Sequence, residues 1–259
     1  MAIPSSVTRW GKTEPFNLQL ARGQIENHKY VFQFGSNPDI NGTEETIWNE
    51  GGLYSYPSAA TAMKVSSTSA DDTAAGTGAR TVVVMGLDEN YDEAEETVTL
   101  NGQTEVTTTT TFIRVFRAYV ATAGSGGTAA GTIYVGTGTV TAGVPATIYS
   151  TITLGQNASL AAIWTVPAGY TAYFTKGNVG TGSSNSNQYI VARLVQRPYG
   201  GVFRTAALVT LQNIDLPFNW EIPLPFEEKT DIEARAYSSG SNNIVFADFE
   251  IIYIKNVSA

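Results

Sequence analysis

The sequence predicts an all-β protein, and three observations support this class. Apolar and polar residues alternate with a period of two over most of the chain after Trp48, as in strands with one buried face. Gly, Asn and Ser gather between these stretches, and Asn101-Gly102 is a strong hairpin signal. No stretch of ten or more residues has the spacing of an amphipathic helix. With 259 residues, 42% of them hydrophobic, the chain can build one large β domain or two small ones.

The first 47 residues differ from the rest, and we expect residues 1–47 to form an extended N-terminal arm. Apolar residues are scattered there, and turn signals follow at Asn37-Pro38-Asp39 and Asn41-Gly42. Residues 1–30 carry four bases and two acids, whereas the whole chain has a net charge of −8. We therefore expect this arm to dock on an acidic surface, and residues 1–33 to be removable without loss of the fold.

Residues 48–149 are expected to form a first β region, either an immunoglobulin-like sandwich or an elaboration of the sheets that follow. Within it, the acidic stretch LDENYDEAEE (87–96) lies between two strand-like runs. Asp88, Asn90 and Asp92 have the spacing of a calcium loop. However, Glu93 stands where such a loop needs Gly, and Thr99 stands where it needs a bidentate Glu. We interpret the stretch as a solvated hairpin tip, with calcium at an irregular oxygen site as the alternative.

The stretch QTEVTTTTTFIRVFRAYV (103–120) joins five threonines to a run of β-forming residues. Mucin-like stalks pair Thr with Pro over long segments, so a strand is the better interpretation. Laid out as one strand, neither face is cleanly polar, which indicates a strand covered on both sides. Arg114 and Arg117 then lie on opposite faces, so at least one of them should meet another subunit or a buried acid.

Residues 150–259 are expected to form a jelly-roll-like β-sandwich, because short strands follow one another at regular spacing. In DIEARAYSS (231–239) the apolar Ile232, Ala234 and Ala236 are expected to face inward. The charged residues that alternate with them, Asp231, Glu233 and Arg235, are expected to face outward. The last strand has one apolar face, which consists of Val245, Ala247, Phe249, Ile251 and Tyr253.

Composition argues against several classes of function. The chain has no cysteine, which excludes disulfides, thiolate metal sites and cysteine nucleophiles. A single histidine, His28, is a poor basis for a Ser-His-Asp triad or a His-rich metal site. The negative charge disfavours nucleic acid as a partner, and no apolar run approaches the ~20 residues of a membrane span. The N-terminus lacks the apolar core of a signal peptide, so we expect a soluble protein made in the host cytoplasm, without enzymatic activity, cofactor or metal.

One string carries a resemblance to a known family. FGSNPDINGTEETIWNEGGLYSYP (34–57) resembles a signature found in virion proteins of tailed bacteriophages, especially marine and cyanobacterial ones. Further blocks fit the same family in order, at residues 86–120, 163–176, 197–212 and 223–239. The resemblance implies a capsid decoration (cement) protein, commonly a trimer seated where capsomers meet, and it marks no active site.

From this resemblance we expect a structural protein on the capsid surface that stabilises the head. Its partners would be the major capsid protein and further copies of itself in a homotrimer. Trp and Arg are common hot-spot residues in interfaces, and this guides our choice of contact residues. These are Arg9, Trp10, Phe16, Arg22, Trp48, Arg114 and Arg117.

Two other functions remain open from the sequence. One is a different virion component, namely a tail adaptor, tail tip or fibre head. The other is a carbohydrate-binding or receptor-binding module, because several tyrosines in loop-like contexts could stack on sugars. These tyrosines are Tyr54, Tyr56, Tyr91, Tyr189, Tyr199 and Tyr237.

Overall fold

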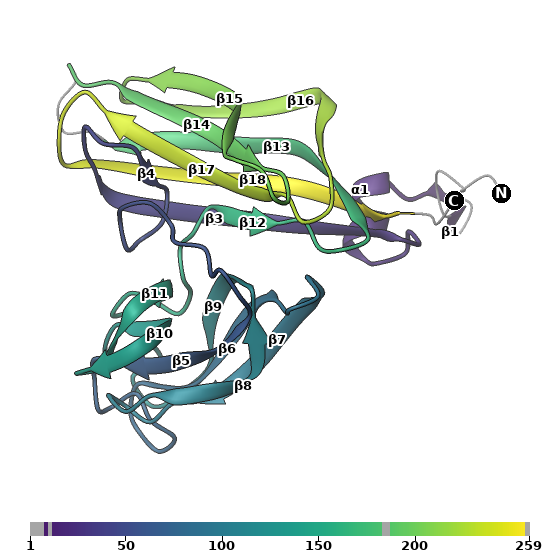
Figure 1. Cartoon of the computed structure of the whole chain (residues 1–259). Coiled ribbons are helices and arrows are strands. Elements are labelled where there is room, and N and C mark those ends of the chain that lie inside the picture. Colours follow the sequence, from purple (N-terminus) through teal and green to yellow (C-terminus); the bar gives the residue numbers. More distant parts are fainter. Residues whose placement is uncertain (1–7, 10–11, 183–186, 257–259) are drawn as a thin grey trace.

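The computed structural model describes residues 8–9, 12–182 and 187–256, and the side chains from residue 14 onward within these ranges. Figure 1 shows two β bodies, one above the other, with α1 and β1 at one end of the upper body. Strands account for nearly all of the regular structure, and the prediction of an all-β protein is confirmed. Among the described residues, the α-helix is the short α1 (Phe16–Ala21).

The upper body is a jelly roll made of two facing sheets. One sheet has the order β16-β13-β18-β3, and the other has the order β12-β17-β14-β15, with β4 also paired to β17. This alternation of strands between two antiparallel sheets is that of a jelly roll, so the predicted architecture is confirmed. Its strands are β3 (His28–Ile40), β4 (Glu45–Thr46), β12 (Ile163–Thr165), β13 (Tyr170–Gly182), β14 (Ile190–Arg197), β15 (Arg204–Leu211), β16 (Asp215–Phe226), β17 (Asp231–Ser238) and β18 (Asn243–Lys255).

The lower body interrupts the jelly roll between β4 and β12, and we call it the insert. It has two sheets of its own, in the orders β11-β10-β5-β8 and β7-β6-β9. This order differs from the ABED and CFG sheets of an immunoglobulin domain. Its strands are β5 (Thr61–Ser67), β6 (Ala79–Leu87), β7 (Glu93–Thr99), β8 (Val106–Phe112), β9 (Arg114–Ala123), β10 (Ile133–Thr141) and β11 (Val144–Ile152).

The insert leaves and re-enters the jelly roll at a single point. β4 and β12 pair one after the other with β17, so together they form one strand that the insert splits. At the split, the N–H of Ala162 donates to Ile47 O at 3.0 Å, and Ile47 N–H and Ala162 O both bond to the backbone of Ala234. Gly35 of β3 lies against this crossing, where any Cβ would collide with the backbone of Ala162 and Ile47.

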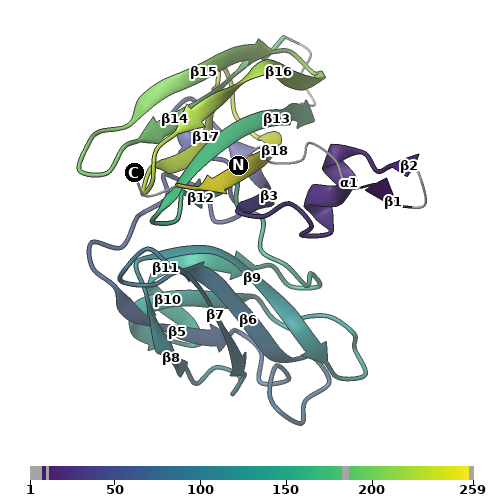
Figure 2. The ribbon, with the colours of Figure 1, turned by 90° about the vertical axis from the view of Figure 1, so that its right-hand side faces the viewer.

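The predicted arm is only partly an arm. Residues 28–40 form β3, which pairs with β18 from His28 opposite Ile254 to Ile40 opposite Asn243. The expected boundary at residue 47 is therefore wrong, because β3 belongs to the jelly roll. The described part of the arm consists of β1 (Thr8–Arg9), β2 (Lys12–Thr13) and α1, which project from the sandwich in Figure 2. Removal of residues 1–33 would cut into β3, whereas removal of residues 1–24 would spare it.

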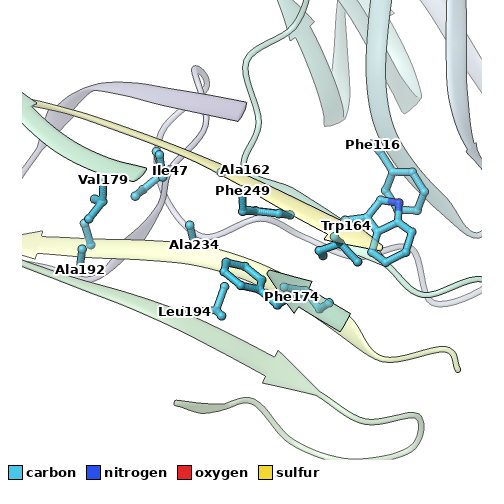
Figure 3. Close-up of a cluster of buried hydrophobic side chains, with 14 of the residues drawn as sticks. Ile47, Phe116, Ala162, Trp164, Phe174, Val179, Ala192, Leu194, Ala234 and Phe249 are labelled. Carbon is cyan, nitrogen blue, oxygen red and sulfur yellow. The ribbon is translucent and has the colours of Figure 1, made fainter. Parts of the chain in front are cut away.

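The alternation predicted for the last strand is confirmed. β18 lies between β13 and β3, and its inward residues Val245, Ala247, Phe249, Ile251 and Tyr253 are all buried. Figure 3 shows the jelly-roll core around Phe249, which includes Phe174 of β13 and Leu194 of β14.

The threonine-rich stretch forms two strands. β8 ends at Phe112 and β9 begins at Arg114, and the two strands lie in different sheets of the insert. The prediction of one strand is wrong because the chain turns a corner at Ile113, whose N–H donates to Leu87 O. No Gly or Pro marks this corner in the sequence, so the local pattern could not reveal it.

Within β8 the threonine run forms an irregular edge strand. The pairing of β8 with β5 shifts register between Ala62 and Lys64. The carboxylate of Glu96 accepts the backbone N–H groups of Thr109 and Thr110 at 2.9 and 2.6 Å. The buried hydroxyl of Thr108 donates to Thr110 O and accepts the N–H of Met63. These bonds hold the irregular segment in place.

Candidate functional site

A buried ion-pair network joins the two bodies. Asp231 of β17 is 2% exposed, and its Oδ1 lies 2.7 Å from Arg114 Nε of β9. Its Oδ2 accepts hydrogen bonds from Arg114 Nη2 at 3.1 Å and from Arg197 Nη2 at 2.6 Å. The hydroxyl of Thr165 donates to Oδ1 at 2.6 Å. One carboxylate therefore binds an arginine from the insert and an arginine from the jelly roll.

A second set of charges continues the network along β17. The guanidinium of Arg235 forms a paired contact with Glu233, with both N–O distances at 2.9 Å. Glu233 also accepts the hydroxyl of Thr46 in β4. Glu44 pairs with Arg193 and with Arg235. The buried Glu233 and the partly buried Glu44 thus each have a cationic partner, as buried charges require.

Aromatic rings separate the arginines of this network. The guanidinium carbons of Arg114 and Arg197 lie 5.0 and 4.5 Å from the ring centre of Tyr56, a geometry that is typical of cation–π contacts. The hydroxyl of Tyr56 lies 3.3 Å from Glu233 Oε2. Burial, reinforced by the charge of Glu233, raises the pKa of Tyr56 well above its usual value, so this tyrosine stays neutral.

This geometry favours a mechanical role over catalysis. Asp231 is sequestered, and its oxygens are occupied by two arginines and a hydroxyl. A general base or nucleophile needs access to substrate, which Asp231 does not have. The network therefore fixes the insert to the outer face of the sheet that contains β17.

The sequence did not identify most of this network. Asp231, Glu233 and Arg235 were expected to face outward into solvent, and this is wrong because the insert and residues 44–57 cover that face of β17. The available signal was three charged residues at alternate positions in one strand of a chain with only 15% charged residues. The expectation that at least one of Arg114 and Arg117 meets a buried acid is confirmed by Arg114. Arg114 is only 7% exposed and pairs within its own chain, so the structure does not present it as a contact residue.

Arg117 has a different environment from Arg114. Its Nη2 donates to Gln33 Oε1 at 2.8 Å, and its guanidinium lies 3.9 Å from the centre of the Phe34 ring. Among the described residues it has no carboxylate partner. Burial lowers its pKa.

The arm residues that we expected to make contacts are only partly described. Trp10 lies outside the described residues, and Arg9 is described for its backbone alone. Phe16 is exposed, with its ring edge-on to His28 at 6.5 Å. Arg22 is partly exposed and pairs with Glu14 inside the arm. Phe16 is therefore accessible for contact with another molecule.

Trp48 is a core residue, which corrects its assignment as a contact residue. It is 4% exposed, its indole N–H donates to Gly51 O at 2.8 Å, and its ring meets Tyr54 edge-on at 5.1 Å. Tyr54 and Tyr56 are enclosed in the same region. They are therefore removed from the set of tyrosines that could stack on a sugar, whereas Tyr189 and Tyr199 are exposed.

The acidic hairpin between β6 and β7 is a self-contained turn. Asp88 Oδ1 accepts the N–H groups of Asn90 and Asp92 at 2.8 and 3.0 Å, and Tyr91 has a φ of 67°. No group of three or more His, Cys, Asp or Glu side chains within the described part of the chain is arranged to hold a metal ion.

An apolar surface lies over β15 and β16, and we call it the β15–β16 surface. These are the edge strands of the two sheets. Its large exposed side chains are Leu208, Ile214 and Ile222. Tyr199 and Val202 are also exposed, but they lie in the loop between β14 and β15, where Tyr199 meets Tyr91 of the insert edge-on at 5.8 Å. A cavity of about 240 Å³ lies between the sheets beneath it, lined by Val209, Leu216, Phe218 and Trp220 among others.

The helix of the described chain has six residues, and nothing in that part has the length and apolarity of a membrane-spanning helix.

No protein-family model matches the chain, and no curated protein matches it. Solved structures that match include that of infectious bursal disease virus Gt strain, at 10% identity over 95% of this chain and 83% of that chain, with a TM-score of 0.21. The VP2 subviral particle of the same virus matches at 10% identity over 90% of this chain and 78% of that chain, with a TM-score of 0.22. At these TM-scores, the matches bear on neither the fold nor the function of the chain.

Proposed function

We propose that the chain is a non-enzymatic structural protein of a virion, which binds the assembled capsid as a decoration protein and stabilises the head as a homotrimer. The observation that carries this proposal is the β15–β16 surface, because an exposed apolar surface of this kind is expected to be buried by other chains in an assembly. The resemblance of residues 34–57 to phage virion proteins gives that assembly its context.

The β15–β16 surface is unusual for an isolated soluble domain. Ile222 of β16 is 84% exposed and Leu208 of β15 is 62% exposed, and both strands are sheet edges. Exposed strand edges with apolar side chains promote association between chains, and natural monomers normally shield them. We assign this surface to contacts between copies of the chain in the trimer.

The arm supplies a second surface, which we assign to the capsid. Phe16 and Leu18 of α1 are both exposed, and the arm projects from the jelly roll. A trimer carries three arms, so weak contacts of each arm with the shell are multiplied by effective concentration. The junction around Asp231 adds mechanical strength, since it joins the two bodies of each subunit without a disulfide.

Cryo-electron microscopy of particles that contain this chain tests the proposal directly. Three copies clustered at repeated positions across the shell are expected, with the arm against the capsid surface. Density confined to the tail would contradict the decoration role.

Deletion of residues 1–24 gives a biochemical test. The variant is expected to fold and to form trimers, since β3 is intact, but to leave undecorated capsids bare in a sedimentation assay. Capsid occupancy equal to that of the full chain would contradict the assignment of the arm.

A further inference from the structure

A groove lies between the jelly roll and the insert, on the other edge of the sheet from β16. It has a volume of about 520 Å³. One wall is β3, with Val31, Phe32 and Gln33, and the other wall comes from the insert, with Met85, Glu95 and Arg117. Phe116 and Trp164 also line it, and Figure 3 shows them next to each other at the boundary of the two bodies.

The β3 wall offers backbone hydrogen bonds to a partner. β3 is the outermost strand of its sheet, and beyond its pairing with β18 no described strand bonds to its other edge. A free strand edge can take up an extended peptide as an additional strand. Phe32 is 45% exposed beside this edge, so it can pack against a side chain of that peptide.

The insert touches β3 at the two ends of the groove. At one end Glu93 pairs with Lys29 and accepts the hydroxyl of Tyr253 at 2.6 Å. At the other end Arg117 donates to Gln33. From Lys29 to Gln33 is four residues of strand, or about 13 Å at ~3.3 Å per residue, which is room for a short extended segment.

Arg117 is a cation without a matching anion. Its described polar contact is a neutral amide, although a guanidinium has five N–H donors that suit a carboxylate. Glu95 lies in the same row of the sheet, since Glu95 and Arg117 are both opposite Met85. Their backbones are two strand spacings apart, about 10 Å, and their side chains line the same groove without forming an ion pair.

We propose that this groove binds an extended segment of a partner polypeptide, which adds a strand to β3 and places a carboxylate side chain on Arg117. The free edge favours a polypeptide over a small anion, and the unneutralised guanidinium favours an acidic segment. The apolar walls at Phe32, Met85 and Phe116 select apolar residues beside the acid. The site goes beyond the proposed virion role, because it assigns a peptide partner to a different edge of the sheet.

Peptide titration against the full chain tests the proposal without any virion particle. The probe is the blocked peptide acetyl-Thr-Val-Val-Asp-amide, which matches the four-residue length of the groove and has its Asp at one end, and its twin has Asn in place of Asp. Isothermal titration is expected to show at least tenfold tighter binding of the Asp peptide. Arg117→Gln is expected to abolish this difference, whereas Arg204→Gln, at an exposed arginine of β15, should preserve it.

Hydrogen exchange separates strand addition from binding of a carboxylate alone. The Asp peptide is expected to slow amide exchange at the β3 edge between Tyr30 and Gln33. Should Arg117→Gln fail to fold, Arg117→Lys replaces it, and the loss of the paired N–H donors is expected to weaken the Asp peptide several-fold. Equal affinity for the two peptides, no binding at millimolar concentration, or binding without protection of β3 would each overturn the proposal.

Discussion

The jelly roll and the insert are both built from two β-sheets, but they leave very different surfaces uncovered. Within the described ranges, the insert strands expose one large apolar residue, Val144, and its loops expose Leu53 and Leu154. The described jelly roll exposes many more, among them Leu208 of β15 and Ile222 of β16. The insert therefore covers its own core, whereas the jelly roll presents apolar surface to partners.

The two bodies also use charge differently. The insert contributes Arg114 to the shared network, while the jelly roll contributes Asp231, Arg197, Glu233 and Arg235. The buried charges of this network are thus shared between the two bodies at their junction. The comparison suggests two separate roles. The junction joins the two bodies of one chain, and the jelly-roll edges make the proposed contacts between chains.

The largest expected effect follows from removal of the central carboxylate. Asp231→Asn leaves the buried Arg114 without a counter-charge, and breaking a buried pair costs about 3–5 kcal/mol. Denaturant unfolding should show this loss, together with separate transitions of the two bodies. Glu89→Gln in the exposed hairpin is the control and should change the unfolding free energy by less than about 0.5 kcal/mol. A single unchanged transition for Asp231→Asn would show that the junction is not what couples the bodies.

A smaller loss of stability is expected where the chain leaves the jelly roll for the insert and returns from it. Gly35→Ala places a methyl group against the backbone of Ala162 and Ile47, and such overpacking costs about 1–3 kcal/mol. Gly182→Ala is a matched control in β13, since the space around that residue is open. Thermal unfolding of the two variants should separate them by several degrees. Equal melting temperatures would mean that the split strand adapts without strain.

Within the insert, Glu96 makes a contribution to stability that depends on pH. Burial opposes its ionisation, but the N–H groups of Thr110 and Thr109 outweigh burial and hold the pKa of Glu96 below its usual value. A depressed folded-state pKa gives stability that is present above the unfolded pKa and is lost as pH falls through the folded one.

We therefore expect Glu96→Gln to cost about 1 kcal/mol at pH 7 and progressively less as the pH falls below the usual glutamate range. The measurement is the unfolding free energy of both proteins at neutral and acidic pH. Glu95→Gln, one residue earlier on the opposite face of β7, should show no such pH-dependent difference. A cost that stays constant with pH would contradict the role of the carboxylate.

The smallest effect on stability, with the largest effect on assembly, is expected at Ile222. Its side chain is almost fully exposed in the single chain, so Ile222→Lys should change the unfolding free energy by no more than about 0.5 kcal/mol. The same substitution should abolish self-association in light scattering, because it places a charge in the proposed subunit contact. Val144→Lys makes the matched change on the insert and should leave association intact. Loss of association in both variants would contradict the contrast between the two bodies.

The sequence predicted the strands of the jelly roll better than it predicted their surroundings. In β17 the alternation is correct, and Ile232, Ala234 and Ala236 face the core. The intervening Asp231 and Glu233 are equally buried, because a body encoded elsewhere in the chain covers the second face. Periodicity reports which residues share a face, but it does not report what lies on that face.

Long-range pairing explains the other errors. β3 has no clean alternation, since one face meets the core and its edge meets the insert groove, and its assignment depends on β18 more than 200 residues later. The corner at Ile113 depends likewise on Leu87 of a neighbouring strand. For the candidate site, the sequence pointed to Arg114 and Arg117, but their partners Asp231 and Gln33 come from distant segments.

The pairing of β3 with β18 also has a consequence for folding during synthesis, because β3 cannot pair until β18 has been made. β3 is made more than 200 residues before β18, the neighbour that it requires. All strands of the insert lie between residues 61 and 152, so the insert has its whole set of strands available much earlier. Domains generally fold as units and in the order of translation, and distant pairings form slowly. We therefore expect the insert to fold before β18 is made and before β3 can complete its sheet.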